Sequence, residues 1–513
     1  MTRVTSWLTP ERFWLFLALL LFIVLWFAAP QKFDSSDPWA YSRLAFAISE
    51  GLDIGRSHVF NHRLAITIPT AFFYSLFGVN IRTTNLLPLC AALTIIVVVW
   101  RALPDKRSKI IGSILCLTSV PLFQASVVLF PDIVVAALMA LSSLMLFSRR
   151  AVIRGSSIAL GIPVLAVGFL FAAFLAKLSS IWVLPLWAWS LVVDLKCSER
   201  NVLLRRFYVP VFISGLCLGA GYLVFCYVTW DDPLARFKAI QAFTGKHLWA
   251  WDNASIQEMV KRLTISPVRL FINQYGILIF VSAVLGVVIA PRSIRPWVYY
   301  VTFCLLFYWF GSTSFTLYEP MPLIDRMTLP MLPGLYILAA FMTSRLNITS
   351  DRPGWINSFL PILLVLGLAG LPFAQYVNSW RHEKLPEAAA MAVVQQEVGS
   401  HPSKEYLLLC SDTRSPRSLS FYFGYHYPDN LHVESVMNLS DELPRSEEIL
   451  VFINRKRSRF LESAYGHRHY DAEIDSLVLS SLYEADGVVL LRAERQESIR
   501  QLMLPNNRME SDR

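Results

Sequence analysis

The chain has 513 residues, of which 55% are apolar and only 16% are charged, and its mean hydropathy is +0.48. Soluble domains carry about 25% charged residues, so this composition excludes a water-soluble enzyme. The formal net charge is +9. Because the basic residues stand in short blocks between apolar runs, they indicate membrane topology and imply no nucleic-acid partner.

Long apolar runs recur from the N-terminus to about residue 376. A helix needs about 20 apolar residues to cross the hydrocarbon of a bilayer. The first run could be mistaken for a cleaved secretory signal, but the many runs that follow favour a retained first span. The pattern predicts eleven spans, near residues 13–30, 83–100, 109–128, 131–148, 157–175, 179–194, 207–229, 270–290, 296–312, 327–343 and 355–376.

One further apolar run, Leu64–Phe77, contains Pro69 and ends at Gly78 after fourteen residues. It is short for a span and predicts an interfacial or re-entrant helix. With this choice and a cytoplasmic N-terminus, the basic blocks of all the short loops fall on the cytoplasmic side, as the positive-inside rule expects. Counting the run as a span would put the first three of these blocks outside.

This topology places residues 31–63, 230–269, 312–326 and everything after about 377 on the outer side. The last of these segments has strand-like runs and a helix-compatible stretch, which predict a small α/β domain. The strand-like runs are Glu405–Cys410, Ile449–Ile453 and Gly487–Leu491, and the helical stretch is Glu387–Val398. The predicted domains are a membrane-embedded part over 1–376, with a first outer loop at 31–63 and an interfacial helix at 64–78, an outer domain over 377–505, and a disordered tail over 506–513.

The first outer loop carries two carboxylates, Asp34 and Asp37, just after the first span and before a predicted amphipathic helix over Trp39–Ser49. Carboxylates at the membrane surface can bind a metal ion or take a proton from a hydroxyl group. Ser36 or Asp37 could instead cap the helix that follows. Both interpretations stay open from the residues alone.

Two more charged residues interrupt apolar sequence at the same outer level. Asp132 follows Pro131 at the predicted outer mouth of the fourth span, where an ionisable side chain is costly enough to indicate a role, although it too could cap a helix. Lys177 lies between the fifth and sixth spans. Its long side chain could extend to the headgroups or hold a lipid phosphate.

The pairs His62-Arg63 and Asp325-Arg326 complete a ring of charges on the outer side. Two arginines and a lysine that face carboxylates suit a phosphate leaving group together with a general base. Ordinary contact with lipid headgroups at helix ends is the alternative for each of these residues taken singly.

Five short patterns follow one another along the chain, and together they resemble a GT-C superfamily glycosyltransferase of the protein O-mannosyltransferase and lipid A aminoarabinose transferase type. The resemblance covers roughly the first 345 residues. The patterns are Asp37-x-x-x-Tyr41-x-x-x-Ala45, Leu76-Phe77-Gly78, Pro131-Asp132, Leu175-Ala176-Lys177-Leu178 and Asp325-Arg326-x-x-x-Pro330-x-x-Pro333.

The resemblance implies a polyprenyl-phosphate-linked sugar donor and a hydroxyl acceptor on a lipid, glycan or protein. It implies transfer on the outer face of the bacterial inner membrane, by a single displacement that inverts the sugar. It gives the catalytic role to Asp37, with Asp34 and Asp132 as further acids. It assigns binding of the donor phosphate to Arg63, Lys177 and Arg326, together with His62.

Three departures from the family pattern bear on the chemistry. Pro38 stands where many members have a second acid, Met327 follows Arg326 where an aromatic residue is common, and His62-Arg63 replaces a Pro-Pro pair. The identity of the sugar and the use of a divalent ion, for which Asp37 and Asp132 are the candidate ligands, therefore stay open.

Two other functions also stay open from the sequence. A transporter or flippase of a lipid-linked glycan needs polar groups near mid-membrane, and the predicted span centres carry almost none. The second open possibility is that the chain is a non-catalytic relative with the same fold.

Overall fold

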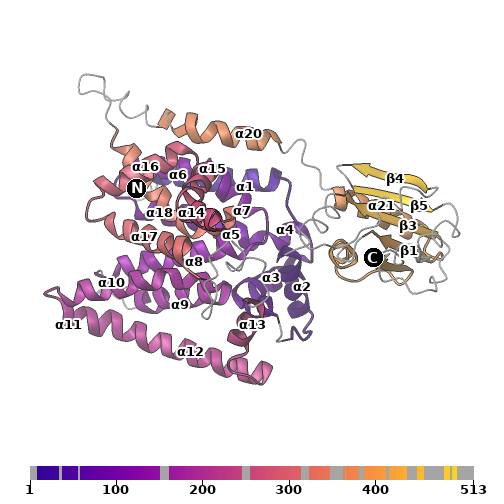
Figure 1. The fold of residues 1–513 in the computed structure, drawn as a ribbon, viewed down its shortest axis with the longest axis horizontal. Coiled ribbons are helices and arrows are strands. Elements are labelled where there is room, and N and C mark those ends of the chain that lie inside the picture. The colour runs from indigo at the N-terminus through magenta and orange to yellow at the C-terminus, as the bar shows by residue number, and fades with distance from the viewer. Residues whose placement is uncertain are drawn as a thin grey trace, which may run out of the picture.

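The computed structural model describes residues 9–33, 37–55, 58–150, 161–244, 255–312, 323–346, 362–363, 365–379, 386–411, 415–435, 448–455, 479–485 and 488–493. These residues form a large helical part and a smaller part built on a mixed sheet, which lies at one end of the molecule (Figure 1).

The helical part begins with helices that run from α1 to α13. Their bounds are α1 (Pro10–Ala28), α2 (Asp37–Ser49), η2 (Val59–His62), α3 (Leu64–Phe77), α4 (Ile81–Thr84), α5 (Leu86–Ala102), α6 (Lys106–Leu117), α7 (Val120–Ser126), α8 (Pro131–Phe147), α9 (Gly161–Ala176), η5 (Leu178–Val183), α10 (Leu184–Leu195), α11 (Arg200–Leu203), η6 (Leu204–Tyr208), α12 (Val209–Trp230) and α13 (Ala235–Thr244).

The rest of the helical part runs from α14 to α20. Its elements are α14 (Ile256–Leu263), α15 (Ile265–Tyr275), α16 (Ile277–Ile289), α17 (Arg295–Phe310), η8 (Asp325–Met331), α18 (Leu332–Ser344), η9 (Leu366–Gly370) and α20 (Leu371–Ser379). The largest apolar cluster lies among α5, α6, α8, α17 and α18.

Several of these helices are suited to a membrane. Within the described residues, four helical segments are long and apolar enough to cross one, and the number rises to six if each of two bent helix pairs is one span. The four segments are Pro10–Ala28, Leu178–Leu195, Arg200–Trp230 and Asp325–Ser344. The predicted membrane character is therefore supported, whereas the count of eleven spans and their orientation stay predictions.

Two of the expected straight spans are broken. Over 109–128, α6 and α7 meet at 55°, and Ser119 begins the second helix by accepting a hydrogen bond from the Leu122 amide at 3.1 Å. Over 270–290, α15 and α16 meet at 108°. Gly276 lies between them with a φ of 79°, a conformation that ends a helix and that glycine adopts without strain. Apolar composition alone does not reveal such breaks.

Helices α16 and α18 approach each other closely at Gly286. A Cβ atom at this position would lie 2.5 Å from the backbone oxygen of Leu338. Small residues allow membrane helices to pack backbone against backbone. The absence of a side chain at Gly286 thus sets the distance between these two helices.

Replacing Gly286 with alanine should lower the thermal stability of the detergent-solubilised protein, because α16 must move away from α18. Overpacking of this kind costs about 1–3 kcal/mol. Gly168→Ala is the matched control, since a Cβ atom there meets nothing within 4 Å. Equal melting temperatures for the two variants would contradict the close approach.

The smaller part contains a five-stranded sheet in the order β2-β1-β3-β5-β4. Strands β2, β1 and β3 are parallel, and β5 pairs antiparallel with both β3 and β4. Apolar side chains fill both faces of the sheet. The elements are α21 (Pro386–Ser400), β1 (Tyr406–Cys410), α22 (Ser415–Leu419), η10 (Ser420–Phe423), β2 (Leu431–Ser435), β3 (Glu448–Asn454), β4 (Leu479–Ala485) and β5 (Val488–Ala493).

Strands form over the three predicted runs, and a helix forms over the predicted helical stretch. Strands β2 and β4 were missed because polar residues interrupt them and they lie at the two edges of the sheet. The predicted domain boundaries stay predictions, and the predicted tail over 506–513 lies outside the described residues.

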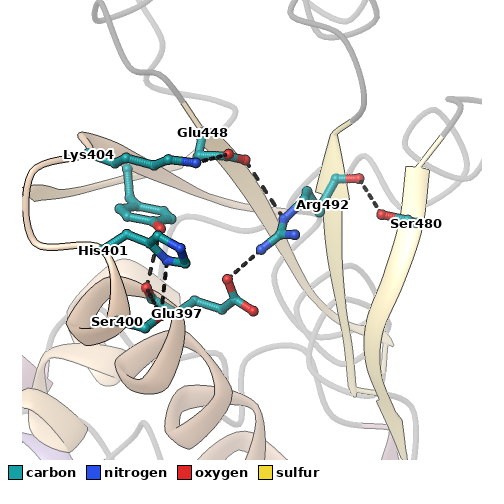
Figure 2. A network of polar contacts seen from close by, with 8 residues as sticks. Glu397, Ser400, His401, Lys404, Glu448, Ser480 and Arg492 are labelled. Carbon is teal, nitrogen blue, oxygen red and sulfur yellow. Dashed lines mark hydrogen bonds and ion pairs between the residues drawn. The ribbon is translucent and has the colours of Figure 1, made fainter.

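A charged network fastens α21 to this sheet. Arg492 of β5 pairs with Glu397 of α21 at 2.5 Å and with Glu448 of β3 at 3.8 Å, and Lys404 pairs with Glu448 at 3.0 Å (Figure 2). Tyr406 donates from its hydroxyl group to the backbone oxygen of Glu397 at 3.2 Å. The helix is thus tied directly to β1 and β5, and to β3 through Arg492.

Candidate functional site

Arg326 lies between the two carboxylates that the sequence singled out. Its Nη1 atom is 3.0 Å from Oδ2 of Asp37, and its Nε atom is 4.0 Å from Oδ2 of Asp132. The guanidinium group also stacks over the ring of Phe130 at 4.4 Å. Asp37 and Asp132 are 95 positions apart (132 minus 37), and the fold brings both to one cation.

Asp132 does not cap its helix. The N-cap of α8 is Phe130, and Asp132 is the second helical residue, with its side chain only 1% exposed. The capping alternative is therefore wrong for Asp132, although the helix dipole still favours its negative charge. Within the described residues, its Oδ2 atom makes no hydrogen bond. A buried acceptor of this kind is costly to the fold and is typical of a functional site.

Lys177 contacts Asp132 instead of extending outwards. It lies at the turn between α9 and η5, and its Nζ atom donates to Oδ1 of Asp132 at 2.6 Å and contacts Sδ of Met327 at 3.1 Å. Burial lowers the pKa of Lys177, and the charge on Asp132 opposes this shift. Extension of the Lys177 side chain to the lipid headgroups is therefore not what the structure shows.

Arg63 forms the third cationic group. It precedes α3, and its guanidinium group lies over the rings of Phe60 and Tyr41 at 4.8 and 5.4 Å and donates to the Tyr41 hydroxyl group. Burial lowers the pKa of Arg63 to about 10, and the charges on Asp37 and Asp132 oppose this. Because the pKa is still well above 7, Arg63 is a cation at neutral pH.

His62 has a different environment from its neighbour. Its buried ring packs edge-on against Trp230, with centroids 4.5 Å apart. Its backbone oxygen accepts a hydrogen bond from Nη1 of Arg236 at 3.3 Å. The structure thus places His62 in the packing between η2 and α12, and its assignment to the donor phosphate stays a prediction.

Sequence reasoning missed Arg236, a residue of α13 that is 3% exposed. It donates to the backbone oxygens of His62 and Phe174 and stacks over the Phe174 ring at 4.1 Å. No pattern distinguishes it from the other basic residues of the segment 230–269. Only burial reveals that it ties α13 to the residues beside Arg63.

Asp37 is the first residue of α2, and its side chain is 23% exposed. His58 lies within its electrostatic range: burial lowers the pKa of His58 and the charge on Asp37 opposes this, so that the imidazole is mostly neutral at pH 7. Asp34 and Ser36 lie outside the described residues, and their predicted roles stay predictions.

The residues present do not fit a divalent metal ion well. Among the residues that the structure describes, no three histidine, cysteine or acidic side chains gather as metal ligands. Asp37 and Asp132 have Arg326 between them, and Asp132 also holds Lys177. An ion would have to displace these cations, so no chemical step is derived through a metal, and its use stays a prediction.

Three cations and two carboxylates therefore meet at one site, which has a net positive charge. Arginine and lysine are the residues that hold phosphate groups, and a partly exposed carboxylate can accept a proton. Such a site suits a negatively charged leaving group beside a nucleophile that must lose a proton.

An apolar cavity of about 170 Å³ opens among α15, α16, α17 and α18. Its lining includes Met331, five residues after Arg326 (331 minus 326). Other side chains in the lining are Phe271, Phe280, Val284, Leu305 and Leu335.

No family model and no curated protein matches this sequence. Solved structures do match its fold. ArnT from Cupriavidus metallidurans in the apo state has a TM-score of 0.58 at 13% identity, and the match covers 96% of this chain and 99% of that chain. The same protein bound to undecaprenyl phosphate has a TM-score of 0.58 at 14% identity, covering 94% and 99%.

A second similar structure is the archaeal oligosaccharyltransferase AglB from Archaeoglobus fulgidus, in complex with an inhibitory peptide and a dolichol-phosphate. Its TM-score is 0.53 at 12% identity, and the match covers 97% of this chain and 75% of that chain. ArnT and AglB are both GT-C superfamily members. The fold expected from the five sequence patterns is thus confirmed, and it extends over nearly the whole chain.

Proposed function

We propose that this chain is a membrane glycosyltransferase that uses a polyprenyl-phosphate-linked sugar donor. The observation that carries this proposal is the placement of Arg326 between Asp37 and Asp132, with Lys177 held by Asp132. The neighbours in fold add support, because one is bound to undecaprenyl phosphate and another is in complex with a dolichol-phosphate.

Asp37 is the proposed general base, because it is 23% exposed whereas Asp132 is 1% exposed. The acceptor is a hydroxyl group of a lipid, glycan or protein. Its oxygen attacks C1 of the sugar as its proton passes to Asp37. The bond between C1 and the phosphate oxygen breaks, and its electron pair stays on the polyprenyl phosphate. A single displacement inverts the configuration at C1.

The cations have the complementary role. Arg326 and Arg63 neutralise the charge that grows on the leaving phosphate, which is the usual basis of catalysis at such centres. Asp132 acts behind them, since it is buried and orients Lys177 and Arg326. Asp34 is proposed as a second acid of the same loop, and His62 as a neighbour of the phosphate site.

The apolar cavity fits the lipid part of the donor. Its lining is almost entirely aliphatic and aromatic. The lining includes Met331, which follows Arg326 by five residues (331 minus 326). The first isoprene units of a donor whose phosphate lies at Arg326 are proposed to enter this cavity. Its volume is below the usual range for whole ligands, so the rest of the chain would lie in the bilayer.

The site is proposed to face the outer side of the bacterial inner membrane. This follows from the topology with eleven spans, a cytoplasmic N-terminus and an outer C-terminal domain, in which the basic blocks of the short loops are cytoplasmic. The loops that carry Asp37, Arg63 and Arg326 then all lie outside.

Binding of undecaprenyl phosphate to the purified full chain tests the proposal. Arg326→Gln should weaken binding about 10- to 100-fold, because a hydrogen bond to a charged group contributes about 1.5–3 kcal/mol. Arg345→Gln is the matched control. Arg345 forms an ion pair of 3.2 Å with Asp105, and neither residue belongs to this site. Equal binding by Arg326→Gln and the wild type, or no binding by the wild type, would remove the proposal.

Sugar transfer itself is measured with a panel of radiolabelled undecaprenyl-phosphate-linked sugars. Loss of label from the donor that depends on the wild-type protein and on an added hydroxyl acceptor is the expected result. Movement of an intact donor across a vesicle membrane without cleavage would favour a flippase.

A further inference from the structure

A short aromatic segment of the C-terminal part, Phe421–His426, contacts the region that carries Asp37. The ring of Phe421 stacks on the ring of Phe33, with centroids 3.8 Å apart and an angle of 12° between the planes. Phe33 is four residues before Asp37 (37 minus 33). The C-terminal part therefore touches the chain just before the start of α2.

Tyr425 contacts α2 itself. Its hydroxyl group donates to Oγ of Ser42 at 2.6 Å, across 383 positions in sequence. Its ring lies 5.0 Å from the ring of Phe46. Ser42 and Phe46 are four residues apart and so share one face of α2. The ring of Tyr425 adds to the apolar cluster that packs α2 on α3.

The hydrogen bond of Tyr425 is one end of a chain of hydroxyl groups. Ser42 is hydrogen-bonded to the hydroxyl group of Tyr74 at 2.5 Å, and Tyr74 is hydrogen-bonded to Thr84 at 2.7 Å. Ser42 and Thr84 are fully buried. Buried networks of this kind hold their members in one arrangement. Helix α2 is thus linked to α3 and α4 on one side and to the C-terminal part on the other.

The backbone of the aromatic segment has an uncommon shape. Gly424 and Tyr425 both have positive φ angles, 63° and 66°. A bulky side chain rarely adopts this conformation, and it persists where the surrounding contacts require it. The amide of Tyr425 donates to the backbone oxygen of Ser420 at 2.8 Å. This turn points the Tyr425 ring at α2.

We infer that Phe421 and Tyr425 are positioning residues, which hold Phe33 and α2 so that Asp37 stays opposite Arg326. The C-terminal part is then a structural component of the site and more than an appended domain. The catalytic consequence of this inference rests on the proposed function, whereas the structural coupling does not. Displacement of a reacting group by about 1 Å can reduce a rate about 100-fold.

Hydrogen exchange of the full-length, detergent-solubilised protein tests the coupling. Phe421→Ala and Tyr425→Phe should each increase exchange in peptides that span α2. Tyr427→Phe is the matched control, because Tyr427 directly follows this segment and its hydroxyl group donates to the backbone oxygen of Pro416, within the C-terminal part. Unchanged exchange in α2 for both test variants, or an equal increase in the control, would overturn the inference.

The second readout is the rate of sugar transfer. For Phe421→Ala and Tyr425→Phe, kcat should fall about 10- to 100-fold, while the Kd for undecaprenyl phosphate stays near that of the wild type. A variant that merely unfolds would lose both sugar transfer and the binding of undecaprenyl phosphate. If the wild type transfers no sugar, the proposed function fails, and the exchange result still decides whether Phe421 and Tyr425 hold α2.

Discussion

Replacing Asp37 with asparagine is expected to reduce sugar transfer about 10²- to 10⁴-fold, which is the usual effect of losing a general base. The side chain keeps its shape but can no longer take the acceptor proton, and its ion pair with Arg326 loses its charge. Because both partners are partly exposed, the stability should change by no more than about 1 kcal/mol. Transfer is measured with purified enzyme, and stability by thermal unfolding.

Asp105→Asn is the matched control for this variant. Asp105 forms an ion pair of similar length, 3.2 Å to Arg345, and caps α6, and asparagine can still cap a helix. This variant should retain wild-type transfer. Transfer by Asp37→Asn close to that of the wild type would remove Asp37 as the base.

Asp34→Asn should be milder than Asp37→Asn. If the two acids share a divalent ion, both changes should be severe, and added metal should partly rescue Asp34→Asn. This comparison decides whether Asp34 and Asp37 share a divalent ion.

Lys177→Met is expected to destabilise the protein by about 3–5 kcal/mol and to abolish transfer. It removes the partner at 2.6 Å from a carboxylate that is only 1% exposed, and an uncompensated buried charge has a cost of this size. The double variant Asp132→Leu/Lys177→Met should recover most of the stability, because an apolar pair often replaces a buried ion pair at little cost. It should not recover transfer, because it lacks both charges.

Arg149→Met is the control for the structural part of this effect. Arg149 forms another buried pair with Asp194, which also accepts from the hydroxyl group of Tyr208 at 2.8 Å. Its loss should lower the melting temperature but leave transfer per folded molecule unchanged. A double variant at Asp132 and Lys177 with wild-type transfer would show that this pair only stabilises the fold.

Several features of this protein depend on local composition and could be predicted from it. Apolar runs identify helices that favour a membrane because burial of apolar surface is set by each segment's own residues. The same holds for the short helix Leu64–Phe77, which ends at Gly78 as expected, and for the strands β1, β3 and β5. Charged residues at the ends of apolar runs drew attention to Asp37, Asp132, Lys177 and Arg326 because charge in such places is costly.

Which of these charged side chains meet could be seen only from the packing of the helices. The position of Arg326 between Asp37 and Asp132 depends on how η8 packs beside α8 and on where the start of α2 places Asp37. Residue spacing does not encode the crossing of helices that are far apart in sequence. The burial of Arg236 against His62 and Phe174 and the contact of Tyr425 with Ser42 have the same origin. Each is a pairing across long sequence separation, whose geometry is fixed only when the whole core is packed.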